Sequence, residues 1–230
     1  MILEKFFNFL DVNFHHKRIA RFLINYNIET VIDIGSHKGE FLENLSKTIS
    51  FNNAFTFEPQ EEIFKILLQK FPDTNKFHHN NVAVSDTVGK KKINISNLTS
   101  TSTLSIENNK SKYLKIKRFL SNDTKQEKDS YDVETVTLDT FFKEKNLNNS
   151  LLKIDVEGHE LNVLEGSKNI IKKIKYVIIE RQYFKSYNNN FPEECDKFLT
   201  KNSFTLFKKF RFPTLHFEDR FYINQIYKKN

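Results

Sequence analysis

The stretch Thr30-Val-Ile-Asp-Ile-Gly-Ser-His-Lys-Gly-Glu-Phe-Leu42 decides the fold of this chain. Its run Val31–Ile34 is short, mainly apolar and β-branched, as in a strand buried on both faces, and apolar residues recur at helical spacing from Phe41 onward. Gly35 and Gly39 lie between the two patterns, where a missing Cβ permits unusual backbone angles and the close approach of a ligand. The stretch predicts a strand, a tight turn and a helix. A plain structural turn is the alternative to a ligand-binding one.

Two common nucleotide motifs are absent from this turn. The dinucleotide fingerprint G-x-G-x-x-G needs glycines at its third and sixth positions, which are His37 and Glu40 here. The P-loop motif needs one more residue between its glycines and a Lys-Ser/Thr ending. The remaining pattern, Asp33-x-Gly35-x-x-x-Gly39, places an acid at the strand end. It suits a ligand whose nearest group is an ammonium, as in the methionine half of S-adenosylmethionine.

A second acid follows the next predicted strand. Ala54-Phe-Thr-Phe57 ends at Glu58, about twenty residues after the glycine turn, where a carboxylate can accept hydrogen bonds from ribose hydroxyls. Glu58 also precedes a helix predicted over residues 61–69, whose positive end would favour an acid by itself. The two roles can coexist.

Composition and length indicate one globular domain. The chain has 230 residues, of which 38% are hydrophobic and 28% charged, enough for a sizeable core. Its single cysteine, Cys195, excludes an intramolecular disulfide and a cysteine-rich zinc site, so we expect a cytoplasmic protein. The N-terminal stretch is interrupted by polar residues, unlike a signal peptide, and no segment approaches transmembrane length. We expect a helical extension over residues 1–28 and a single domain over 29–230.

Strand and helix patterns continue to alternate after Glu58, which predicts a doubly wound α/β sheet. A third strand is expected over 77–84. Asn81 in this segment is a candidate partner for an adenine base, with a turn-forming Asn pair as the alternative. The Ser/Thr-rich loop Asn97–Ser105 carries hydroxyls that can meet a polar substrate, although composition alone favours a flexible loop.

The second chemical stretch is Leu151–Glu160, in which an apolar strand ends at an acid and a helix follows a glycine. Asp155 and Glu157 share one side if the chain stays extended. With His159 they form a candidate acid–base cluster at the carboxyl end of a strand next to the first. The alternative is that acids here favour the positive end of the helix. A further apolar strand ends at Glu180, which can converge on the same cleft.

Several of these segments resemble the FkbM family of S-adenosylmethionine-dependent methyltransferases. The resemblance spans roughly residues 31–181, and its most specific part is Lys153-Ile-Asp-Val-Glu-Gly-His-Glu160. The other matching segments are Asp33–Gly39, Phe57-Glu-Pro59, Asn81-Val-Ala-Val-Ser-Asp86, the Ser/Thr loop and Val136-Thr-Leu-Asp139. His37 departs from the general methyltransferase pattern, which has a glycine in the middle of the turn.

The resemblance implies a class I methyltransferase fold, a mostly parallel doubly wound sheet of seven strands with the last one antiparallel. Residues 204–210 and 221–227 would supply the final two strands. It also implies O-methylation of a hydroxyl on a sugar, a glycan or a secondary metabolite. The residues expected to hold S-adenosylmethionine are Asp33, Gly35, Ser36, His37, Gly39, Glu58, Pro59, Asn81, Ala83 and Asp155.

Within this site, Asp33 and Gly35 would hold the methionine part of the cofactor, Glu58 the ribose and Asn81 the adenine. The expected catalytic residues are Asp155, near the methyl group, and Glu157 or His159 as base, where His has the more convenient ordinary pKa. The expected acceptor contacts are Ser100, Thr101, Ser102, Thr103 and Glu180.

Two alternatives stay open. A divalent cation on Asp155 and Glu180 would lower the pKa of the acceptor hydroxyl, and carboxylate ligands suit magnesium or manganese, but we favour the metal-free version. The formal net charge of +7 permits an anionic partner, so an RNA-directed methyltransferase or a non-catalytic nucleotide- or nucleic-acid-binding module is the competing class. We expect a small-molecule or glycan acceptor and no nucleic acid, and the sequence leaves the oligomeric state open.

Overall fold

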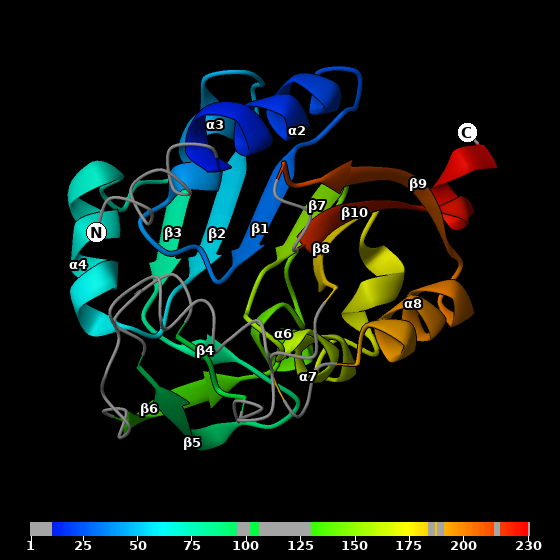
Figure 1. The fold of residues 1–230 in the computed structure, drawn as a ribbon. Helices are drawn as coiled ribbons and strands as arrows, with labels where there is room; N and C mark the ends of the chain where they lie inside the picture. Colours follow the sequence, from blue (N-terminus) through cyan, green and yellow to red (C-terminus); the bar gives the residue numbers. More distant parts are fainter. Residues whose placement is uncertain are drawn as a thin grey trace.

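The structure, a computed structural model, is a seven-stranded sheet with helices on both faces and a smaller sheet below one edge (Figure 1). It describes residues 11–95, 102–105, 130–183, 187, 191–213 and 217–229. The strand order of the large sheet is β3-β2-β1-β7-β8-β10-β9. Its strands are β1 (Thr30–Ile34), β2 (Asn53–Phe57), β3 (Phe77–Asn80), β7 (Ser150–Ile154), β8 (Tyr176–Gln182), β9 (Phe204–Arg211) and β10 (Phe217–Asn224).

The pairing of these strands matches the predicted class. β1 runs parallel to both β2 and β7, whereas β10, the last strand in the chain, runs antiparallel to both β8 and β9. Every residue of β1 and of β7 is buried, as expected for central strands covered on both sides. The prediction of a mostly parallel seven-stranded sheet with an antiparallel last strand is therefore confirmed.

Helices cover the two faces of the sheet because each face carries its own apolar core (Figure 1). Ile32 and Ile34 of β1 face the core shared with α6 (Leu138–Phe141), α7 (Glu160–Glu165), the short helix η3 (Ile170–Lys173) and α8 (Pro192–Lys201). Val31, the residue before Ile32, faces the core shared with α2 (His16–Leu23) and α3 (Glu40–Ser46). The other helices of the described residues are η1 (Asp11–His15), α4 (Glu61–Lys70) and η4 (Gln225–Lys229).

The smaller sheet lies below the carboxyl ends of β1, β2 and β3 (Figure 1). Its order is β4-β6-β5, from β4 (Ala83–Val84), β5 (Gly89–Asn94) and β6 (Ser130–Val136). The single third strand predicted over 77–84 is therefore wrong, since β3 stops at Asn80 and β4 pairs with β6 instead. The chain leaves the large sheet at Asn81, whose side-chain amide donates to the carbonyl oxygens of Glu58 and Pro59 at 2.8 and 3.2 Å.

The last strand also differs from the prediction. β10 begins at Phe217, four residues before the predicted start at Phe221. The predicted strand began after three charged residues in succession, Glu218, Asp219 and Arg220, yet all three are buried in β10. Partners make their burial possible: Arg220 Nε donates to Glu218 at 2.7 Å, and the ring of His15 lies 2.7 Å from Asp219.

Within the part of the chain that the structure describes, the helices are all too short or too polar to span a lipid bilayer.

A first prediction concerns Gly166, which ends α7 against the loop after β4. A Cβ at this position would lie 2.1 Å from the carbonyl oxygen of Ser85, although the backbone angle, φ −79°, suits any residue. We expect Gly166→Ala to lower the free energy of unfolding by about 3 kcal/mol, because packed backbone must move apart. Urea unfolding followed by circular dichroism measures this change.

Gly89→Ala is the matched control. Gly89 has φ +146°, which strains a side chain, but a Cβ there meets no atom within 4 Å. We expect a loss of about 1 kcal/mol from strain alone. A loss for Gly166→Ala no larger than this control would show that the contact of α7 with Ser85 is not tightly packed.

Candidate functional site

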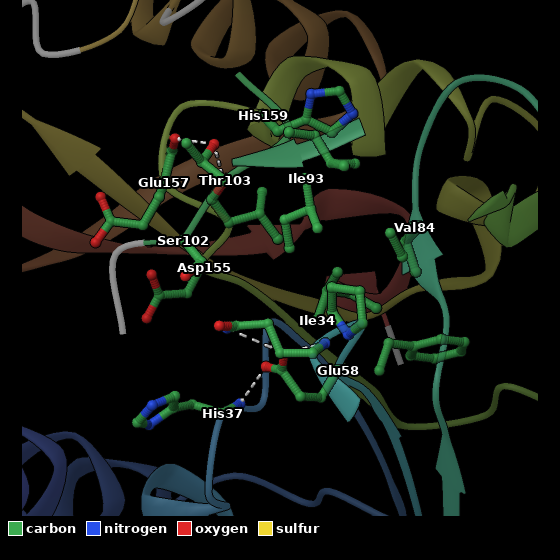
Figure 2. A pocket seen from close by; sticks show the side chains of 17 residues that line it. Ile34, His37, Glu58, Val84, Ile93, Ser102, Thr103, Asp155, Glu157 and His159 are labelled. Atoms are coloured by element: carbon green, nitrogen blue, oxygen red, sulfur yellow. Dashed lines mark hydrogen bonds between the residues drawn. The ribbon is translucent and has the colours of Figure 1, made fainter. Parts of the chain in front are cut away.

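A pocket lies where the carboxyl ends of β1, β2 and β7 meet the smaller sheet (Figure 2). It contains about 550 Å³ of space, part of which is open to solvent. Parallel strands bring their carboxyl ends to one edge, which is why segments far apart in the sequence share this pocket. Its lining residues are Ile34, Gly35, His37, Phe57, Glu58, Pro59, Gln60, Ala83, Val84, Ile93, Ser102, Thr103, Leu104, Asp155, Val156, Glu157 and His159.

The turn after β1 touches the turn after β7. Gly35 has φ +76°, and a Cβ on it would lie 1.9 Å from the carbonyl oxygen of Asp155. The amide of Asp155 in turn donates to the carbonyl of Ile34 at 3.0 Å. Glycine is therefore required at position 35 by the neighbouring turn as well as by its own backbone angle.

His37 connects this turn to the acid after β2. Its backbone N–H donates to Glu58 Oε2 at 3.0 Å, and its backbone is held at φ +48°, a conformation unusual for a residue with a side chain. The His37 ring lies 3.2 Å from Glu40. Burial alone would raise the pKa of Glu40, but the hydrogen bond with His37 holds it at about 2. The first turn of α3 is thus tied to the pocket wall.

Glu58 stands in the middle of the pocket and is only 3% exposed (Figure 2). Its other oxygen, Oε1, accepts a hydrogen bond from the backbone N–H of Gln60 at 2.8 Å. Burial raises the pKa of Glu58, and the backbone hydrogen bonds oppose this rise. Oε1 also accepts a hydrogen bond from the side-chain amide of Gln60 at 3.3 Å. Since a carboxylate oxygen has two lone pairs, Oε2, which accepts from His37, has one that a ligand hydroxyl can use.

The pocket lining combines apolar and polar groups. The apolar residues are Phe57, Ala83, Val84, Ile93 and Leu104, from both sheets and the 102–105 segment. In Figure 2, Val84 lies on one side of Glu58, whereas His37, Asp155 and Glu157 lie on the other side. The pocket can therefore hold a ligand with a flat apolar group at one end, a hydroxylated middle and a charged tail.

Four residues predicted for the cofactor lie outside the pocket lining. Asn81 uses its amide to hold the backbone after β2, as described above. Ser36 is buried below the turn. A Cβ on Gly39, which has φ +75°, would meet Leu67 of α4 at 2.7 Å, so this glycine serves the packing of α3 against α4. The fourth is Asp33.

Asp33 is fully buried within β1, on the face opposite to Ile34. Burial raises its pKa to about 6, and nearby Lys153 opposes the rise. Lys153 Nζ lies 3.9 Å from Asp33 and donates to Asp155 Oδ2 at 2.9 Å. Asp155 is partly exposed and lines the pocket, so Lys153 connects the buried acid of β1 to the acid at the pocket wall.

The turn after β7 has strained backbone angles and is held in place by hydrogen bonds. Glu157 has φ +53°, and its Oε2 accepts hydrogen bonds from Gln182 Nε2 at 2.6 Å and from the hydroxyl of Tyr187 at 2.9 Å. The next residue, Gly158, has φ +92°, and a Cβ there would lie 2.7 Å from the Tyr187 ring. Glu160 accepts from the Gly158 N–H at 2.9 Å, and burial raises its pKa to about 7. Backbone held in this way fixes the direction of the Glu157 side chain.

The Ser/Thr segment closes over this turn. Thr103 donates its hydroxyl to the carbonyl of Glu157 at 2.7 Å, and the Ser105 hydroxyl donates to the carbonyl of Gly158 at 2.8 Å. Thr103 and Ser102 both line the pocket, as Figure 2 shows. The Thr103 hydroxyl thus has a structural partner, while Ser100 and Thr101 lie outside the described residues.

His159 faces the smaller sheet. Its Nε2 lies 2.9 Å from the hydroxyl of Ser85, which also accepts a hydrogen bond from Lys91 at 2.7 Å. Burial lowers the pKa of His159 to about 4, and the charge of Lys91 adds to this effect. The expectation that the ordinary pKa of histidine suits proton abstraction therefore does not hold at this position.

Glu180, at the end of β8, lies beside the pocket lining and not in it. It accepts a hydrogen bond from Gln182 at 3.1 Å, and burial together with Asp155 and Glu157 raises its pKa well above the ordinary value. Among the described residues, no three His, Cys, Asp or Glu side chains are grouped so as to hold a metal ion, the candidates Asp155 and Glu180 included.

Three residues that position the site were not singled out from the sequence. Lys153 interrupts an apolar strand, and a lysine inside a buried strand is a signal that a carboxylate partner lies nearby. Gln182 and Tyr187, which hold Glu157, have no such local signal, because their contacts depend on how β8 and the following segment lie against the turn after β7.

Comparison with known proteins gives a family and a fold. A sequence model of the methyltransferase FkbM domain matches residues 33–206. The FkbM methyltransferase from Methylobacillus flagellatus KT has 14% identity and a TM-score of 0.55, with 85% of this chain and 43% of that chain covered. This chain therefore spans less than half the length of that protein.

Two further structures are similar. A putative tRNA (m1A22) methyltransferase from Streptococcus pneumoniae, in complex with S-adenosyl-L-methionine, has 9% identity and a TM-score of 0.52, covering 90% of this chain and 71% of that one. Fibrillarin from Aeropyrum pernix, with natively bound S-adenosyl-L-methionine, has 8% identity and a TM-score of 0.50, covering 91% and 76%. At these identities the similarity concerns the fold alone. No curated protein matches the sequence.

A second prediction follows from the buried His159. Below pH 6.5 the unfolded chain takes up a proton on this histidine, whereas the folded chain, with a pKa of about 4, does not. This contribution to stability is therefore lost as the pH falls from about 6.5 towards 4. The variant His159→Gln lacks this titrating group. The difference in free energy of unfolding between the wild type and the variant should therefore change by about 2 kcal/mol, to the disadvantage of the wild type, as the pH falls from 7 to 5.

Urea unfolding of both proteins at half-unit pH steps measures this difference. Between pH 7 and pH 8 the two stability curves should run parallel, which serves as the internal control. Parallel curves down to pH 5 would mean that His159 titrates as freely in the folded chain as in the unfolded one.

Proposed function

Because this chain belongs to the methyltransferase FkbM family, we propose that its pocket binds S-adenosylmethionine and that it methylates a hydroxyl group of a sugar, a glycan or a secondary metabolite. The observation that carries the proposal is the position of Glu58. It is a buried carboxylate between an apolar and a polar end of one pocket, at the carboxyl edge of the sheet.

The lining residues fit the parts of this cofactor. The apolar residues around Val84 and Ile93 suit the adenine ring, and Glu58 can accept a hydrogen bond from a ribose hydroxyl at Oε2. A second ribose hydroxyl would replace the side-chain amide of Gln60 at Oε1. The turn with Gly35 and His37 would face the methionine part. In this proposal Asp33 acts through Lys153 and Asp155 instead of touching the cofactor directly.

The bound cofactor supplies an electrophilic methyl group on a positively charged sulfur. The protein then has to align the acceptor hydroxyl, exclude water and accept one proton. We assign proton acceptance to Glu157, whose carboxylate accepts hydrogen bonds from two neutral donors, Gln182 and Tyr187. Asp155 already accepts a hydrogen bond from the Lys153 ammonium at 2.9 Å. The acceptor hydroxyl would lose its proton to Glu157 as its oxygen takes the methyl group.

The charge around the polar end favours a neutral acceptor. Asp155, Glu157 and Glu180 lie close enough to one another to raise the pKa of Glu180. Such a group of acids accepts hydrogen bonds from sugar hydroxyls and repels phosphodiesters. An RNA acceptor, such as the tRNA that gives the Streptococcus pneumoniae protein its name, would have to bring its phosphates past these acids.

The third prediction tests the cofactor site. Calorimetric titration of the purified protein with S-adenosylhomocysteine should give saturable binding that magnesium does not change. Glu58→Ala should weaken it by about tenfold to a hundredfold, because hydrogen bonds to a charged group are lost. Glu61→Ala, which removes an exposed acid in the first turn of α4, is the matched control and should bind as the wild type does. Absence of binding by the wild type would overturn the proposal.

The fourth prediction tests the base. Glu157→Gln should lower the rate of methyl transfer to a hydroxyl acceptor by about a hundredfold and leave the affinity for S-adenosylhomocysteine within about threefold. The assay uses a methyl-labelled donor with a panel of neutral sugars and, separately, with RNA. Transfer to RNA, with an affinity that falls steeply as salt rises, would replace the sugar proposal with the nucleic-acid one.

A further inference from the structure

We propose that His15 and Asp219 position Asp155 for its part in the site. Through these two residues, the N-terminal segment stabilises the wall of the methyltransferase pocket. His15 is a positioning residue in this proposal, which rests on the function proposed above. Both residues lie outside the stretch that matches the family model, residues 33–206. Nothing in that match therefore assigns them a role.

The first step is the contact itself. His15 ends η1, and its Nε2 lies 2.7 Å from Asp219 Oδ2 in β10, where the His15 side chain is fully buried and that of Asp219 is 5% exposed. The His15 ring packs edge-on against Phe212 and Phe217, both at 5.4 Å between ring centroids. The Arg18 guanidinium lies 3.2 Å from Nδ1, the other ring nitrogen, and can only donate to it. The histidine is thus held by two aromatic rings and an arginine, with Nε2 directed at one buried carboxylate.

The second step is the place of Asp219 in the sheet. It pairs in register with Glu180 of β8, and its charge acts on Lys153 of β7. Lys153 lies among acids, 2.9 Å from Asp155 and 3.9 Å from Asp33. One ammonium thus lies within reach of several carboxylates on the same face of the sheet, at the edge that carries the pocket.

The third step is the ionisation of Asp219. Burial would raise the pKa of Asp219, but the hydrogen bond with His15 together with the neighbouring positive groups, Lys153 among them, lowers it. Asp219 thus stays ionised with His15 as its hydrogen-bond partner, and Lys153 remains paired with Asp155 and Asp33. Without the histidine, a buried carboxylate lacks its donor, which is costly. Lys153 would then be drawn towards Asp219 and away from Asp155, loosening the pocket wall.

The test distinguishes two roles of His15. One is to position Asp155, and the other is only to hold the N-terminal segment against the sheet. His15→Phe keeps the packing with the two phenylalanines and removes the donor, and it should raise the dissociation constant for S-adenosylhomocysteine about tenfold. His15→Gln keeps an N–H near the position of Nε2 and should restore affinity to within about threefold of the wild type.

Asn44→Ala is the matched control for attachment. Asn44 Nδ2 donates to the carbonyl of Val12 at 3.1 Å, so this variant loosens the same segment without touching the charged residues. It should lower the melting temperature and leave the affinity unchanged. If His15→Phe binds as tightly as Asn44→Ala, the inference fails. If the wild type does not bind, the proposed function fails instead.

A double variant guards against loss of folding. Asp219→Asn removes the buried charge that the His15 hydrogen bond stabilises, so in this background His15→Phe should cost less than about threefold in affinity. A cost of tenfold in both backgrounds would overturn the inference, because the effect would not pass through the charge of Asp219. If His15→Phe alone does not fold, the double variant with Asp219→Asn decides the question. A folded double variant with near-normal affinity for S-adenosylhomocysteine supports the proposal, and tenfold weaker binding contradicts it.

Discussion

The close contact between the turns after β1 and β7 is the constraint on which the rest of the site depends. The carbonyl of Asp155 occupies the space that a Cβ of Gly35 would need, and the Asp155 amide continues the ladder of β1 through Ile34. Two chemically important turns are thereby held as one unit. The pocket is open above this contact, with Glu58 on the β2 side and Glu157 on the β7 side.

Charge inside the sheet is the second organising feature. A lysine in the buried strand β7 is tolerated because Asp33 and Asp155 lie beside it, and the burial of Asp33 is tolerated because of the lysine. The burial that would lower the pKa of Lys153 is outweighed by these neighbours, which raise it, so the ammonium stays charged. Asp155, at the pocket wall, thus interacts with Lys153 and through it with Asp33, two buried residues outside the pocket lining.

Several polar side chains near the pocket hold the structure together. His159 contacts the hydroxyl of Ser85, Thr103 and Ser105 donate to the carbonyls of the strained turn, and Asn81 donates to the backbone after β2. These contacts join the smaller sheet and the 102–105 segment to the large sheet. The hydroxyls of Thr103 and Ser105 and the amide of Asn81 thus have partners within the protein, beside Asp155 and Glu157 in the pocket lining.

The sequence by itself determined the fold class, the strands β1, β2, β7 and β8 with the acids that follow them, and most of the pocket residues, because periodicity, glycine turns and strand-end acids are local signals. It placed Gly35, His37, Glu58, Asp155 and Glu157 together correctly, since carboxyl ends of parallel strands share an edge. Only the tertiary structure decided that Asp33 faces Lys153, that β4 leaves the large sheet, that His159 is buried and that His15 reaches Asp219. Those outcomes depend on burial and on partners distant in the chain, which no local pattern contains.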